Sequence, residues 1–210
     1  MGFAKLMSAQ PGLLGAQIVT VEADLAKGLH AFALVGLPDK AVEESRDRVS
    51  AAIKNSGWKS PKQRNQKITI ALAPADLRKS GPIYDLPIAL CYLMAADDIR
   101  FDPSGRLFIG ELALDGSVRR VDGVLASVIA AKKAGYTEAY VPKENADEAG
   151  LIDGIDVYAV GSLEEVVSHL LPESEIAREH PDRPAITLKR MSAHKRRVAN
   201  APSPKSGSFQ

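Results

Sequence analysis

The sequence has few cysteines, few aromatic residues and no long apolar run, and each of these features would indicate a particular class of protein. A single cysteine, Cys91, excludes an intramolecular disulfide and a cysteine-based metal site. Aromatic residues make up only 5% of the chain, so Ala, Val, Ile and Leu must supply most of the core. No run reaches the roughly 18 apolar residues of a membrane-spanning helix, and the N-terminus lacks a signal-peptide pattern. These absences predict a cytoplasmic protein that does not enter a membrane.

Apolar periodicity predicts strands and helices built around one core. Alternation with period two indicates strands, and spacings of three and four residues indicate helices. The expected strands span 17–25, 29–37, 67–74, 106–114, 117–121, 137–142 and 155–160. The expected helices span 39–56, 86–96, 124–134, 144–151 and 162–171. Strand pairs combined with single strand–helix units indicate an α/β (α+β) fold with a mixed sheet packed with helices.

Short-range signals set the expected boundaries of these elements. A brief Ala-Lys-Gly link joins the first two expected strands, which we therefore expect to form a hairpin. The pair Asp115-Gly116 predicts a second hairpin. Asp39 and Asp85 are expected to cap the N-termini of their helices, and Ser162 with Glu165 forms a capping box.

Composition divides the chain near Pro172. Residues 1–172 have the periodicity of one folded domain, and residues 173–210 form a tail. Between Ile186 and Gln210 there are six Lys or Arg and no acid, with no apolar period. We therefore expect residues 173–210 to be a basic, disordered tail.

The clearest local charge bias lies between Lys54 and Lys79. The formal net charge is only +1, so any surface that attracts nucleic acid must be local. Seven Lys or Arg in this stretch accompany a single acid, Asp76, and basic side chains neutralise phosphates. Trp58 lies among them and would either stack on a base or pack at a helix end. The alternative is a solvated loop. The candidate DNA-binding residues are Lys59, Lys62, Arg64, Lys67, Arg78 and Lys79.

Several long phrases resemble the first domain of the magnesium-chelatase-like AAA ATPases, the ComM/YifB family. They include TVEADLAKGLHAFALVGLPDKAVEESRDRVSAAIKNSGW, ITIALAPADLRKSGPIYDLPIALCYLMAA and IGELALDGSVRRVDGV. The resemblance runs from Leu13 to about Leu171. It implies a Lon-protease-like domain of the ribosomal-protein-domain-2-like superfamily.

The resemblance also implies that protease chemistry is missing. Lon proteases place a serine in a GPSAG-like turn and pair it with a lysine, which takes the serine proton. The matching positions here hold Ile83, in the turn GPIYD, and Leu125. Ser80 and Ser127 are each displaced from the matching positions. We therefore expect no catalytic residue in this chain.

No phosphate-binding string GxxxxGK[ST] occurs, and the four histidines match no metal motif. The resemblance thus predicts a chain truncated before the ATPase module, with ATP and Mg²⁺ expected only for that module. We expect no cofactor and no metal in this chain. The implied role is a non-catalytic domain that contacts DNA and self-associates in a ring. The alternatives are a purely structural module, a remnant of a truncated gene, or a cryptic peptidase that uses Ser80 or Ser127.

Overall fold

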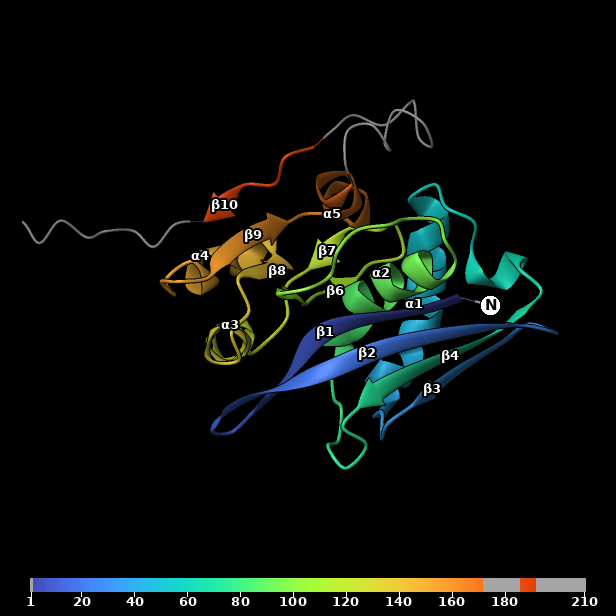
Figure 1. Cartoon of the computed structure of the whole chain (residues 1–210), viewed down its shortest axis with the longest axis horizontal. Coiled ribbons are helices and arrows are strands. Elements are labelled where there is room, and N and C mark those ends of the chain that lie inside the picture. The colour runs from blue at the N-terminus through green and yellow to red at the C-terminus, as the bar shows by residue number, and fades with distance from the viewer. Residues whose placement is uncertain (1, 172–185, 192–210) are drawn as a thin grey trace, which may run out of the picture.

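The computed structural model of the chain describes residues 2–171 and 186–191. These residues form two four-stranded sheets and a short two-stranded ribbon, with helices between and around them (Figure 1). The mixture of parallel and antiparallel strands with packed helices confirms the predicted α/β (α+β) class. None of the described helices is long and apolar enough to cross a bilayer.

The first sheet has the strand order β1-β2-β4-β3. Its strands are β1 (Gly2–Gly12), β2 (Gly15–Lys27), β3 (Ala31–Val35) and β4 (Gln66–Ala73). β1, β2 and β4 are antiparallel neighbours, whereas β3 runs parallel to β4. The expected hairpin between the strands at 17–25 and 29–37 is therefore wrong, because β4 lies between them. β1 was not predicted, since its inward positions include the polar Ser8 and Gln10 and show little apolar alternation.

The second sheet has the order β10-β9-β8-β5. Its strands are β5 (Arg106–Phe108), β8 (Glu138–Pro142), β9 (Asp156–Val160) and β10 (Arg190–Met191). The ribbon pairs β6 (Glu111–Leu112) with β7 (Val118–Arg119) across the Asp115-Gly116 turn, as predicted. The single strand expected at 106–114 is broken after β5, because the N–H of Gly110 leaves the sheet and donates to the carbonyl of Ile83 at 3.0 Å.

Among the described residues, five helices cover and separate the sheets. They are α1 (Lys40–Asn55), α2 (Asp85–Ala95), α3 (Val124–Lys133), α4 (Ala146–Ala149) and α5 (Leu163–Leu170). Three single 3-10 turns join them: η1 (Pro61–Gln63), η2 (Pro82–Tyr84) and η3 (Lys143–Asn145). Two predicted caps are confirmed, since Asp39 accepts from the N–H of Val42 at 2.9 Å and Ser162 accepts from the N–H of Glu165 at 3.1 Å.

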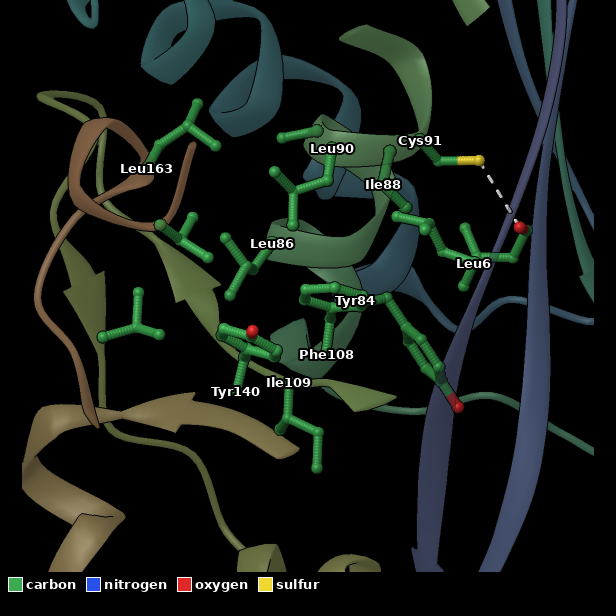
Figure 2. Packing of buried hydrophobic residues seen from close by; sticks show 14 of the residues in the cluster. Leu6, Tyr84, Leu86, Ile88, Leu90, Cys91, Phe108, Ile109, Tyr140 and Leu163 are labelled. Carbon is green, nitrogen blue, oxygen red and sulfur yellow. Dashed lines mark hydrogen bonds between the residues drawn. The ribbon is translucent and has the colours of Figure 1, made fainter. Parts of the chain in front are cut away.

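α2 is the centre of the core and is buried on nearly every side. Figure 2 shows its side chains pointing both toward Leu6 of β1 and toward Phe108, Tyr140 and Leu163 on the other side. Cys91 on this helix donates its thiol hydrogen to the carbonyl of Val21 at 3.4 Å, and burial raises its pKa to about 12. Cys91 is thus a buried free thiol.

Part of the expected tail is folded. Residues 186–191 lie along β9, where Leu188 is buried and its N–H donates to Nδ1 of His169 at 3.2 Å. Disorder was thus the wrong prediction for these six residues, because they cover a strand edge that would otherwise carry free backbone groups. The alternation of Ile186 and Leu188 was the signal available in the sequence. The remainder of 173–210 lies outside the described residues.

Acidification is expected to weaken this packing through His169. Its Nδ1 must be unprotonated to accept the hydrogen bond, and burial lowers its pKa below the ordinary value of 6.5. The unfolded chain then takes up the proton at a higher pH than the folded chain does. We expect the free energy of unfolding, measured with urea, to fall as the pH drops below 6.5.

His169→Gln should flatten that part of the pH profile, whereas His30→Gln, at an exposed position before β3, should leave it intact. Equal pH profiles for the wild type and His169→Gln would show that this hydrogen bond does not carry the dependence.

Candidate functional site

The GPIYD turn at 81–85 lines an open cavity of about 640 Å³ between β1, η2 and the segments around β6 and β7. This volume is typical of small-ligand sites. Its walls include Gln10, Ser80, Ile83, Glu111, Arg120 and Asp122. No Lys or His of the described residues lines the cavity.

The two positions that correspond to a Ser-Lys dyad are apolar and are not brought together at this cavity. Ile83 lies in η2 and is buried, at 3% exposure. Leu125 lies on the first turn of α3, is half-buried and does not line the cavity. Neither side chain can give or take a proton, so the pair contributes packing at these positions.

The two displaced serines are engaged in other contacts. Ser80 accepts a hydrogen bond from the amide of Gln10 at 3.1 Å. Ser127 is fully buried and donates to the carbonyl of Gly123 at 2.9 Å. A serine nucleophile needs a neighbouring base, and neither hydroxyl has a lysine or histidine among its described hydrogen-bond partners.

Gln10 forms the polar floor of the cavity. Its Oε1 accepts from the N–H of Ser80 at 2.9 Å and from the hydroxyl of Tyr84 at 2.8 Å. Its Nε2 donates to Ser80 and to the carbonyl of Pro11, so the amide is used at both ends. Burial raises the pKa of Tyr84 and keeps its hydroxyl protonated as a donor. The hydrogen bonds of Gln10 therefore hold the GPIYD turn in place.

At the end of this turn, Asp85 is completely buried and accepts hydrogen bonds from two other elements. The guanidinium of Arg48 reaches it from α1, with Nε 2.6 Å from Oδ2 and Nη2 3.1 Å from Oδ1. The hydroxyl of Ser45 donates to Oδ1, and the N–H of Leu112 in β6 donates to Oδ2 at 3.2 Å. Burial raises the pKa of Asp85, and the hydrogen bonds from Arg48 and Ser45 oppose that shift.

The predicted capping role of Asp85 is wrong. η2 runs directly into α2, so the position before the helix is Tyr84 and no side chain caps the first turn. The N–H of Leu86 instead donates to the carbonyl of Gly110 at 3.0 Å. With its backbone already helical, the Asp85 carboxylate points away from the helix start and binds α1 and β6. Ser45 and Arg48 were not singled out as one site from the sequence, although their spacing of three places them on one helix face.

The six candidate DNA-binding residues do not form one patch. Lys59, Lys62 and Lys67 are exposed around η1 and the start of β4, whereas Arg78 is exposed in the loop after the end of β4. An eight-residue strand separates these two ends by roughly 25 Å. A nucleic acid bound at one end need not reach the other.

Two of the six cations already hold carboxylates. Lys62 lies 2.8 Å from Asp47, and both side chains are largely exposed. Arg64 donates from Nη2 to both carboxylate oxygens of Asp98, at 2.6 and 2.7 Å, and is mostly buried. The exposed pair contributes little stability and can exchange its carboxylate for a phosphate, whereas the Arg64–Asp98 pair holds the end of α2.

Lys79 does not reach the surface. It is fully buried, its ammonium donates to the carbonyl of Pro74, and burial lowers its pKa. Lys79 is therefore wrong as a candidate DNA contact. Its backbone pairs with the segment before α1, where it donates to the carbonyl of Leu37 at 3.1 Å and accepts from the N–H of Asp39 at 2.9 Å. Trp58 is likewise buried at the end of α1. This is the predicted packing at a helix end, and the buried indole cannot stack on a base.

Comparison with known proteins agrees with this architecture. The family described as "Subunit ChlI of Mg-chelatase" matches residues 21–145, more than half of the chain. The chain belongs to the ChlI family. It is 42% identical over 164 residues to protein YifB of Escherichia coli (strain K12), covering 78% of this chain and 32% of YifB.

Two further relatives support the family and the fold. It is 42% identical over 156 residues to competence protein ComM of Haemophilus influenzae, covering 74% of this chain and 30% of ComM. It is 28% identical over 173 residues to the Lon protease of Leptospira interrogans, covering 80% of this chain and 20% of that protease. The chain thus spans about a third of the length of its ChlI-family relatives, and the Lon-protease-like fold is confirmed.

Removal of the buried carboxylate should destabilise this ChlI-family domain strongly. Asp85→Ala leaves the guanidinium of Arg48, whose side chain is 19% exposed, with only the more distant carboxylate of Glu44, 3.8 Å away. The expected loss in the free energy of unfolding is about 3 kcal/mol or more, measured by urea denaturation. The double variant Arg48→Met/Asp85→Leu should recover much of that loss, because an apolar pair leaves no unpaired charge.

Asp97→Ala is the matched control, since Asp97 pairs with Arg100 on the exposed surface. It should change the unfolding midpoint far less. Similar losses for Asp85→Ala and Asp97→Ala would show that the buried network is not a principal source of stability.

Proposed function

We propose that this chain is a non-catalytic N-terminal domain of a ComM/YifB-type ATPase of the ChlI family, and that it contacts DNA. Three exposed lysines, Lys59, Lys62 and Lys67, at the η1 end of the first sheet carry the proposal. Their ammonium groups are accessible, and Lys67 extends along the backbone at Gly28, next to the exposed Lys27. Clustered ammonium groups bind the phosphates of nucleic acid without reading its sequence.

The absence of protease chemistry is part of the same proposal. Ile83 and Leu125 occupy the two dyad positions, and no described lysine or histidine lines the cavity beside Ile83. Family membership supports a further role for the domain in ring assembly within the longer relatives. ATP and Mg²⁺ would then bind to a separate module.

The triple variant Lys59→Glu/Lys62→Glu/Lys67→Glu tests the DNA contact. It should weaken binding to fluorescent double- and single-stranded DNA at low salt by at least about tenfold. It should also make the dependence of binding on salt concentration shallower, because fewer counterions are released. Fluorescence anisotropy over a salt series measures both quantities.

A triple variant with the same change in charge, Lys132→Glu/Lys133→Glu/Lys143→Glu, is the control. These exposed lysines lie on α3 and η3, away from the η1 end. An equal loss of DNA binding in both triple variants would show that the effect comes from the net charge of the chain and not from the lysines near η1. No DNA binding by the wild type at low salt would remove the DNA contact from the proposal.

A further inference from the structure

The first sheet has one backbone edge left open, at β3. The order β1-β2-β4-β3 places this strand last, and β4 is its only partner among the described strands (Figure 1). At the other side of the sheet, β1 packs beside β5. An open edge presents unpaired N–H and C=O groups, which are a template for another strand.

β3 carries none of the usual protections of an open edge. Its sequence is AFALV, without a charge or a proline, and the structure gives it a regular extended form from Ala31 to Val35. Phe32 and Leu34 are half-buried on the helix side of the sheet, and the residues between and around them are exposed. Natural edge strands generally use charge, proline or bulges to prevent pairing, so this edge is suited to accept a partner.

A groove of about 310 Å³ runs between β3 and α1. It is lined by Phe32 and Leu34 from the strand and by Glu43 and Arg46 from the helix. Both charged side chains are exposed, and neither forms an ion pair with another residue in the described part of the chain. The groove therefore offers apolar contacts together with one charge of each sign.

The pattern around Ala33 is symmetric in a way that suits a second copy of the chain. Phe32 and Leu34 lie one residue to each side of Ala33, and Ala31 and Val35 lie two residues to each side. Leu29 and Leu37, both exposed, lie four residues to each side. An antiparallel pair centred on Ala33 would place Phe32 opposite Leu34 of the second copy, which is a favourable aromatic–aliphatic cross-strand pair.

We infer that two copies of this chain pair through β3, antiparallel and about a two-fold axis perpendicular to the sheet. The two four-stranded sheets then form one continuous sheet, and both α1 helices lie on the same side of it. The same axis brings Glu43 of each copy toward Arg46 of the other. A two-fold interface must be self-complementary, and both the apolar pair and the charge pair meet that condition.

This inference does not depend on the DNA contact. It also differs from the contact that closes a ring, which is head-to-tail and joins two different surfaces. Five residues of strand and one helix face form a small interface, so we expect a reversible dimer whose population rises with concentration.

Charge reversal across the axis provides the test. Sedimentation velocity of the full 210-residue chain, from low micromolar to near-millimolar concentration, should show the monomer–dimer equilibrium. Glu43→Arg and Arg46→Glu should each weaken the dimer by at least about tenfold, because each places like charges opposite one another. The double variant Glu43→Arg/Arg46→Glu should restore dimerisation, since the charges are complementary again.

Lys54→Glu is the control, because it makes the same change in charge as Arg46→Glu on the last turn of α1. It should leave the dimer unchanged, and circular dichroism should show all variants folded. A wild type that stays monomeric at every concentration would overturn the inference. So would single variants that dimerise like the wild type, or a double variant as weak as the singles.

Discussion

A buried carboxylate at the start of α2 is the interaction on which the rest of this domain depends. Asp85 binds Ser45 and Arg48 of α1 and the N–H of Leu112 in β6, and so joins elements from distant parts of the chain. A carboxylate at zero exposure is costly unless each oxygen is paired, and here both oxygens are. The contact fixes α1, α2 and the ribbon in one arrangement, around which the two sheets pack.

The GPIYD turn that leads into α2 is held by packing and by hydrogen bonds. In the GPIYD turn, Ile83 packs inward one residue before Tyr84, and the Gln10 amide holds the turn from below. Ile83 therefore contributes to packing at this turn. Two surfaces of the described residues are accessible: the exposed lysines near η1 and the edge strand β3.

Local sequence patterns predicted most helices and strands, but they did not predict which strands pair with one another. The caps and the hairpin turn involve contacts within a few residues, so the sequence alone predicts them at Asp39, Ser162 and Asp115-Gly116. The insertion of β4 between β2 and β3 depends on pairing across 40 residues or so, which no short pattern encodes. The surface position predicted for Lys79 was wrong for the same reason, because its burial accompanies pairing with Leu37 and Asp39, which are distant in the sequence.

Residue-resolved hydrogen exchange at Leu112 tests the central role of Asp85 most directly. Its N–H lies in a ribbon strand of only two residues, where exchange would ordinarily be fast. If the Asp85 network joins the domain together, this amide should exchange only through global unfolding, as slowly as the amide of Ile70 in the centre of β4. Exchange at the rate of a frayed ribbon, much faster than Ile70, would contradict the account.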